Sequence, residues 1–323
     1  MRIAKAFFVA AAVVSSAAAQ ERVQFKPEVG HPTFAVREPV SKLRPGTILV
    51  SNTMMGPYYT VEGGAFPGEV GPFYIEGATT KDTLVVEVLK VRPNHDIAAS
   101  QISGSFGGLA GESRVLFLAD PIPDRRYVWR LDRERMTGKT TLPGSKMREI
   151  EIDLQPMLGR VGVAPRGAEA FAGMWPGDFG GNMDAVELRE GTTVYLPVFH
   201  DGAYFYFGDG HAAQGEGEVN GTGLETSMDV AFRIDLVKGK RIAWPRFEDA
   251  EYIMVAGSAR PLIDAFRLAH IELVRWLEDE YGFGRMDAYT LVGQLAVSTV
   301  ANIVDPSYTV VAKFPKRYLP PRN

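Results

Sequence analysis

The sequence predicts a mainly β protein with a jelly-roll or β-sandwich core and a smaller α+β portion at its C-terminal end. From about residue 38 to residue 256, short apolar runs are separated by turns rich in glycine and proline, of which the 323-residue chain has 34 and 21. Several of these runs alternate apolar with polar side chains, as strands with one buried face do. After residue 256 the apolar side chains recur at helical spacing instead. Many short strands with frequent turns are typical of sandwiches and jelly rolls.

Two alternating runs and two continuous apolar runs mark individual strands. Residues 150–154 and 228–236 place apolar side chains at every second position, with mostly polar ones between them. Residues 83–91 and 115–119 are more continuously apolar, which favours strands that are buried more deeply.

The clearest local signal is that of a β-hairpin. The runs 192–200 and 203–211 flank Asp201-Gly202, a pair that readily adopts the positive φ angles of a tight two-residue turn. If the turn is centred there, Thr192 faces His211, and Asp209 and His211 lie at the far end of the hairpin. Residues 180–184 enter the hairpin at that same end.

Two helices and a strand are expected after residue 256. Phe266, Ala269, Leu273, Leu277 and Tyr281 form an apolar stripe, and Gly282 ends that helix. A second helix is expected over residues 286–297, and extended structure returns at residues 308–314. We therefore divide the chain into a β-rich region at 20–256 and a C-terminal α+β region at 257–323 that packs on the β core.

Residues 1–19 have the pattern of an export signal. Arg2 and Lys5 are positively charged, residues 6–14 are apolar, and residues 17–19 are small, as a signal peptidase requires. We therefore expect a periplasmic or secreted protein that has no membrane attachment after cleavage. A permanent anchor is the weaker alternative, because the apolar run is about half of the roughly 20 residues that span a bilayer.

The composition excludes several classes of function. A content of 46% hydrophobic and 23% charged residues is ordinary for a globular protein. The net charge of −4 is spread along the chain, so we expect no nucleic-acid partner. The chain has no cysteine, which excludes disulfides, thiolate zinc sites and cysteine nucleophiles.

Polar side chains that could carry chemistry concentrate in residues 208–218, GDGHAAQGEGE. Glycine lets the backbone adopt unusual conformations, so several polar side chains can converge on one point. A solvated acidic loop is the plainer interpretation of such a segment. Convergence with residues 182–184 at one end of the hairpin favours a binding or active site instead.

Several separated motifs resemble those of the acetamidase/formamidase family. Residues 180–226 contain GGNMD, then DGHAAQGEGE and GTGLET; GPFYIEGA at 71–78 and GVAP at 162–165 are also similar to family motifs. The similarity spans roughly residues 40–318. Glu216 stands where the family usually has aspartate, and residues 79–82 depart from its usual turn, so a ligand role for Glu216 stays open.

The resemblance implies hydrolysis of short aliphatic carboxylic amides, such as formamide or acetamide, to the carboxylate and ammonia. It also implies a jelly-roll scaffold, a homo-oligomer and a divalent metal near the centre. Because a site that contains histidine favours transition metals, we expect zinc rather than calcium.

Six residues are the candidates for that chemistry. Asp184, Asp209 and His211 are the predicted metal ligands, since a metal could stabilise the oxyanion and activate water. Glu76 or Glu218 could carry the proton to the leaving nitrogen. Gln214 either donates to the substrate carbonyl or ties its own loop together.

Serine catalysis and a noncatalytic binding role are the two alternatives to metal-assisted amide hydrolysis. Serine catalysis is disfavoured, because the chain has no doubled-serine amidase motif and no nucleophile elbow of the form G-x-S-x-G. A noncatalytic exported jelly-roll module that binds calcium or carbohydrate remains as the alternative from another class.

Overall fold

The computed structural model describes residues 20–110 and 122–322. The expected export signal at 1–19 and the expected strand at 115–119 lie outside the described residues. Within the described ranges, no helix has both the length and the apolar character needed to cross a membrane.

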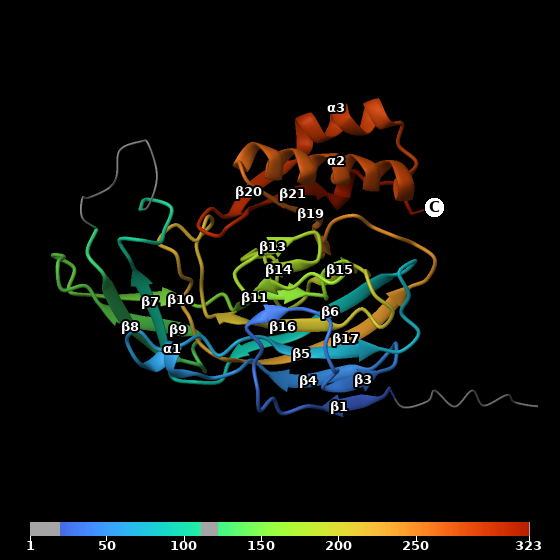
Figure 1. Ribbon diagram of the computed structural model, residues 1–323. Helices are drawn as coiled ribbons and strands as arrows, with labels where there is room; N and C mark the ends of the chain where they lie inside the picture. The colour runs from blue at the N-terminus through green and yellow to red at the C-terminus, as the bar shows by residue number, and fades with distance from the viewer. Residues whose placement is uncertain (1–19, 111–121, 323) are drawn as a thin grey trace, which may run out of the picture.

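Two large sheets face each other and form a β-sandwich, as the sequence predicts (Figure 1). The larger sheet has nine strands in the described ranges. In order across the sheet they are β1 (Arg22–Gln24), β4 (Ile48–Asn52), β17 (Met228–Val237), β6 (Thr83–Pro93), β15 (Thr193–Pro197), β18 (Arg246–Glu248), β19 (Tyr252–Ala259), β21 (Tyr308–Pro315) and β20 (Val297–Asn302).

The smaller sheet of the sandwich includes the strands that carry or adjoin most of the predicted site residues. Its six described strands are, in order, β13 (Pro176–Gly177), β14 (Gly180–Asn182), β11 (Met157–Gly162), β16 (Phe205–His211), β5 (Val70–Ile75) and β3 (Ser41–Leu43). A four-stranded sheet lies beside the sandwich: β10 (Glu149–Asp153), β9 (Thr137–Thr141), β8 (Arg125–Asp132) and β7 (Ile97–Ile102). The pair β12 (Phe171–Ala172) and β2 (Thr33–Phe34) completes the strands.

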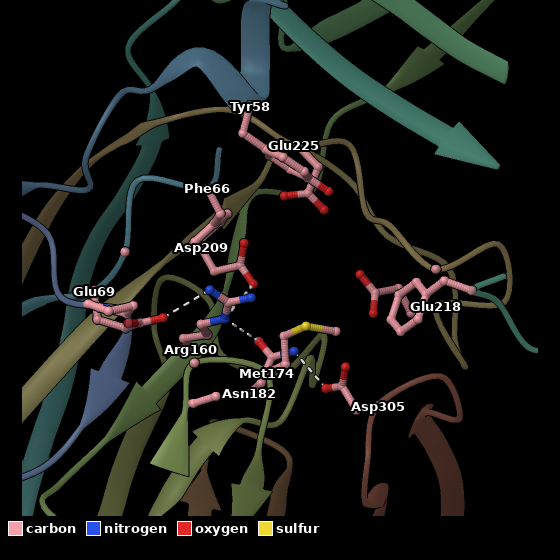
Figure 2. Close-up of a pocket in the computed structure, with 16 residues that line it drawn as sticks. Tyr58, Phe66, Glu69, Arg160, Met174, Asn182, Asp209, Glu218, Glu225 and Asp305 are labelled. Carbon is pink, nitrogen blue, oxygen red and sulfur yellow. Dashed lines mark hydrogen bonds and ion pairs between the residues drawn. The ribbon is translucent and has the colours of Figure 1, made fainter. Parts of the chain in front are cut away.

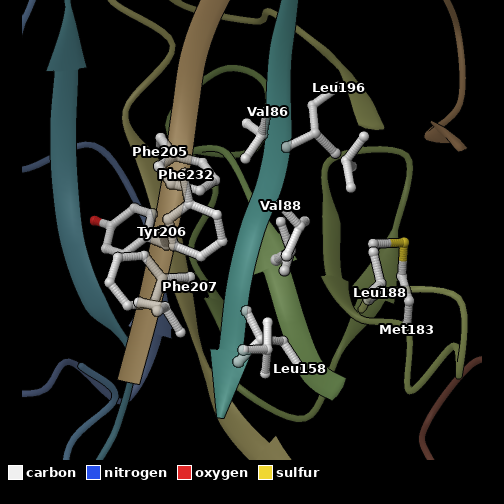
Figure 3. Packing of buried hydrophobic residues seen from close by; sticks show 14 of the residues in the cluster. Val86, Val88, Leu158, Met183, Leu188, Leu196, Phe205, Tyr206, Phe207 and Phe232 are labelled. Carbon is white, nitrogen blue, oxygen red and sulfur yellow. The ribbon is translucent and has the colours of Figure 1, made fainter. Parts of the chain in front are cut away.

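The main hydrophobic core fills the space between the two large sheets (Figure 3). Val86 and Val88 of β6 and Phe232 of β17 project from the larger sheet, and Phe205 and Phe207 of β16 project from the smaller one. The Phe207 and Phe232 rings lie 5.0 Å apart between centroids, so aromatic packing joins the sheets directly. The expected strands at 83–91 and 228–236 are confirmed as β6 and β17. The run at 150–154 forms β10, whose apolar side chains are only half-buried.

A second core lies between the helices and the C-terminal strands (Figure 1). Helix α2 (Leu262–Tyr281) covers β19 and β21, and α3 (Arg285–Leu295) packs on α2; α1 (Pro57–Thr60) and η1 (Lys316–Tyr318) are short. Gly282 caps α2 with a φ of 69°, as predicted. The expected stripe is right except at Phe266, whose side chain is 42% exposed. Residue 256 lies within β19, so the C-terminal strands continue the larger sheet.

The predicted hairpin is wrong. Its two strands belong to different sheets: β15 pairs with β6 and β18, whereas β16 pairs with β11 and β5. Gly202 adopts a positive φ as expected, but its backbone bonds go elsewhere: its N–H donates to Ala78 and its carbonyl accepts from Ile75. Ala203 and Tyr204 also have φ of 57°, which turns the chain across the sandwich instead of back along β15. Thr192 therefore does not face His211.

Candidate active site

Strand β11 brings the predicted site residues together in place of the hairpin. Met157 of β11 lies opposite His211 of β16, and Arg160 lies between Gly208 of β16 and Asn182 of β14. Asp184 lies two residues after the end of β14, and its backbone N–H donates to the carbonyl of Gly159. Residues around positions 184 and 211 thus meet because both flanking strands pair with β11.

His211 is held by Gln214 in one orientation. The Nε2 atom of Gln214 donates to the backbone oxygen of Asp184 at 2.7 Å, so its Oε1 atom is left as an acceptor, 2.7 Å from Nδ1 of His211. This network assigns the hydrogen to Nδ1. The Nε2 atom of His211 then faces two carboxylates, 3.1 Å from Oε1 of Glu225 and 3.4 Å from Oδ1 of Asp209.

Two groups of potential metal ligands share His211 in the described part of the chain. One group is Asp184, His211 and Glu218, and the other is Asp209, His211 and Glu225. In each group the ligand atoms lie within 4.8 Å of one another, and all the residues are buried. The structure thus brings the three predicted ligands together, although the two aspartates belong to different groups. Each group also contains a glutamate that was not among the predicted ligands, Glu218 in one and Glu225 in the other.

Six buried carboxyl groups lie around this centre in the described ranges, and we call them the acidic cluster: Glu69, Asp184, Asp209, Glu218, Glu225 and Asp305. Figure 2 shows five of them around one pocket, with Arg160 among them. Buried carboxylates require partners, because transfer of an unpaired charge from water is costly. Arg160 and a protonated His211 together supply too little positive charge for six ionised acids.

Arg160 contacts two acids of this cluster and Asn182. Its Nη1 donates to Oε1 of Glu69 at 2.9 Å, and its Nε donates to Oδ1 of Asn182 at 2.7 Å and lies 3.2 Å from Oδ2 of Asp209. Burial lowers the pKa of Arg160, but the carboxylates of Asp209 and Glu69 outweigh burial and raise it. The guanidinium therefore stays charged and holds these acids in place.

The carboxyl groups of the cluster differ in acidity. Burial raises the pKa of Asp184, Glu218 and Glu225. Burial also raises the pKa of Asp305 to about 7, although Asn182 and Asn302 donate hydrogen bonds to it.

The pKa values of Asp209 and His211 are shifted so that both side chains favour their charged forms. Burial opposes ionisation of Asp209, but Arg160 and His211 lower its pKa to about 2. Burial likewise opposes protonation of His211, but Glu225 and Asp209 raise its pKa. Without a further cation the cluster therefore holds a mixture of protonated and ionised acids.

The donor set fits a divalent cation. Oδ1 of Asp184, Nε2 of His211 and Oε2 of Glu225 are buried and have no hydrogen-bond partner among the described residues. Gly159 leaves room beside them: a Cβ atom there would be 2.4 Å from Oδ1 of Asp184 and 2.7 Å from Oδ2 of Asp209. Imidazole with carboxylate oxygens is a ligand set that zinc accepts readily.

The backbone is strained at three acids of the cluster. Six non-glycine residues in the described ranges have positive φ, and three of them are Asp184 at 44°, Asp209 at 57° and Glu218 at 46°. Such conformations cost about 1–3 kcal/mol each and persist where the surroundings enforce them, commonly at functional sites. The strain supports a functional purpose for this cluster.

Two sequence-based assignments change. Glu76 is exposed at the far end of β5, whereas the pocket is lined by Glu69, at the other end of that strand. A strand of this length extends roughly 20 Å, so Glu76 does not reach the cluster. Gln214 uses both ends of its amide within the protein, so it does not donate to a substrate but positions His211.

Arg160, Glu69 and Asp305 are site residues that sequence reasoning missed. Arg160 is the one charged residue in the apolar run MLGRVGVA, which is a signal that could have identified it. Glu69 and Asp305 are single acids in loops far from residue 211 in sequence, and nothing local distinguishes them.

The chain is similar in sequence to known amidases. The sequence profile of the acetamidase/formamidase family matches residues 167–318. The chain is 27% identical to an acetamidase of Mycolicibacterium smegmatis over 218 residues, which are 52% of this chain and 53% of that protein. It is 28% identical to a formamidase of Methylophilus methylotrophus over 212 residues, 52% of this chain and 51% of that protein. These matches span about half the length of the two relatives.

Solved structures extend the comparison to nearly the whole chain. An acetamidase from Yersinia enterocolitica superimposes with a TM-score of 0.85 at 30% identity, covering 95% of this chain and 96% of the other. An acetamidase from Bacillus halodurans, at 24% identity and a TM-score of 0.78, covers 92% and 98% and shares the fold. With similarity of this extent across both sheets and the helical portion, the chain belongs to the acetamidase/formamidase family.

Proposed function

We propose that this protein hydrolyses the C–N bond of short aliphatic carboxylic amides and releases the carboxylate and ammonia, with a divalent metal at the acidic cluster. One observation carries the proposal: His211 directs an unpartnered Nε2 atom at two buried carboxylates inside a pocket. The names of relatives, acetamidase and formamidase, agree with it. The family match does not favour the noncatalytic binding module.

The ion would be held by His211 with Asp209 and Glu225 of one group and Asp184 of the other, which leaves Glu218 free to carry a proton. We propose zinc before calcium, since calcium prefers oxygen ligands alone. When bound, the ion would supply Lewis acidity toward the amide carbonyl and toward water.

The residues of the chain would handle the protons. Water adds to the carbonyl carbon and loses a proton to the ionised carboxylate of Glu218, which lines the pocket. The C–N bond then breaks while that proton passes from Glu218 to the leaving nitrogen, which departs as ammonia. The carboxylic acid product then gives its proton to water and leaves as the carboxylate.

The remaining expectations extend the proposal. We propose a periplasmic or secreted location, on the basis of the charged, apolar and small residues at positions 1–19. We also propose a homo-oligomer. Neither affects the chemistry described above.

The test is an assay of ammonia release from formamide, acetamide and propionamide by the purified protein, together with elemental analysis. We expect release from at least one amide, loss on treatment with a chelator, and recovery on addition of Zn²⁺. Release that is unaffected after complete metal removal would contradict the metal. No release from any amide, in protein that contains its metal, would contradict the amidase.

A further inference from the structure

The pocket over the acidic cluster is larger than a short amide requires. Its volume is about 320 Å³. Acetamide displaces roughly three waters of about 30 Å³ each, so it would fill roughly a third of this volume. The rest of the pocket must receive another part of the substrate or remain filled with water.

Large apolar side chains form part of the wall of the same pocket. Tyr58 lies beside Glu225 and Phe66 beside Asp209, Phe106 comes from the loop after β7, and Met174 lines the pocket as well (Figure 2 labels all but Phe106). Met174 is 41% exposed, so its side chain is accessible to a ligand in the pocket. A substrate with an apolar group would cover this surface.

The Tyr58 side of the wall is held rigidly. The rings of Tyr58 and Phe66 meet edge to face at 5.6 Å, and the guanidinium of Arg160 lies 4.0 Å from the centroid of Phe66. Arg126 donates to the backbone oxygens of Tyr58 and Val61 at 2.9 and 3.2 Å. The wall is therefore formed before any ligand binds.

Phe106 is seated on the loop that carries Glu218. A Cβ atom on Gly221 would lie 2.6 Å from Cδ1 of Phe106, so the ring packs directly against this glycine. The neighbouring Gly108 donates its N–H to the carbonyl of Val219 at 2.8 Å. The ring of Phe106 therefore packs on the same loop that carries Glu218, the proposed proton carrier.

The charges exclude other kinds of substrate tail. The lining acids belong to the acidic cluster, and Arg160, the one cationic lining residue in the described ranges, already contacts Glu69, Asn182 and Asp209. A second carboxylate on a substrate would find no other cationic side chain among the described lining residues and would be repelled by the acids that the ion does not hold.

We propose that the preferred substrate carries an uncharged, ring-sized apolar acyl group, such as an arylalkyl amide, which packs between Tyr58, Phe66, Phe106 and Met174. The inference rests on the proposed amidase activity and changes the expected length of the acyl group. Acetamide is then a small, weak substrate of the same site.

The test compares kcat/KM for acetamide and phenylacetamide in the metal-loaded protein. We expect phenylacetamide to be favoured at least about tenfold, since burial of an aromatic ring contributes a factor of that order. Phe106→Ala should lower the ratio of the two kcat/KM values by about tenfold, mainly through KM for phenylacetamide. Phe266→Ala, which removes a half-exposed phenylalanine on α2, should leave both values unchanged.

A calorimetric titration with phenylacetamide separates the two proposals. If acetamide is hydrolysed as well as phenylacetamide, or if Phe106→Ala leaves the ratio unchanged, the inference is overturned while the amidase stands. If no amide is hydrolysed, the amidase proposal fails. Binding of phenylacetamide that Phe106→Ala weakens would then still support the apolar pocket, and absence of binding would overturn it.

Discussion

Gln214 bridges His211 and Asp184: its Oε1 lies 2.7 Å from Nδ1 of the imidazole, and its Nε2 donates to the backbone oxygen of Asp184 at 2.7 Å. A group that orients a metal-ligating histidine typically contributes about 10–100-fold in metal affinity. We therefore predict that Gln214→Met weakens zinc binding by that factor, as measured by calorimetry on the apo protein. The exposed Gln155 provides the control, Gln155→Met, which should bind zinc normally. Equal affinities in the two variants would remove the positioning role of Gln214.

Glu218 and Glu76 form a matched pair for testing the proton carrier, because the first is buried in the pocket and the second is exposed at the end of β5. Glu218→Gln should lower kcat by about 10²–10⁴-fold, the usual contribution of a general acid or base. Glu76→Gln should retain the wild-type rate. The measurement is ammonia release at saturating amide, with circular dichroism as the check on folding. A wild-type rate in Glu218→Gln, or a large loss in Glu76→Gln, would reverse the assignment.

Gly159 provides the space in which two acids approach each other. Because its added Cβ would lie 2.4 Å from Oδ1 of Asp184, Gly159→Ala should push the carboxylates apart. We predict a loss of about 1–3 kcal/mol in the free energy of unfolding and loss of zinc binding. Gly144→Ala is the control, since no atom lies within 4 Å of its added Cβ. Urea denaturation of both variants measures the effect, and equal stability would show that the cluster tolerates the methyl group.

Asp82 links stability to pH far from the active site. Burial alone would raise its pKa, but Lys238 and hydrogen bonds from the N–H groups of Gly239 and Thr79 lower it below its usual range. Since the folded pKa is depressed, the stabilisation is present above the unfolded value of about 3.9 and is lost as pH falls through the folded pKa.

Asp82→Asn should therefore cost about 1.5–3 kcal/mol of unfolding free energy at pH 7, the range for hydrogen bonds to a charged group. The difference from wild type should shrink below pH 4. Asp229→Asn breaks a half-exposed pair with Lys90 and should cost less than about 1 kcal/mol. Urea denaturation at pH 7, 5 and 3 tests both, and a difference that grows on acidification would contradict the sign.

The sequence predicted those parts of the fold whose signals are local. Strand β17 and helix α2 follow from apolar periodicity, and strand β6 follows from a continuous apolar run. The end of α2 follows from Gly282. In each case residues that are neighbours in sequence carry the signal. The motifs around residues 184 and 211 also identified the region of the site before any pairing was known.

Only the tertiary structure decided how that site is assembled. The turn at Gly202 has the same local chemistry whether its backbone bonds close a hairpin or go to another segment. Here they go to Ile75, the last residue of β5, and to Ala78 in the turn after it. Arg160 and Glu69 form their buried ion pair across 91 residues of sequence, and Asn182 reaches Asp305 across 123. Such contacts depend on which strands pair with β11, and strand pairing is set by burial across the whole sandwich rather than by nearby residues.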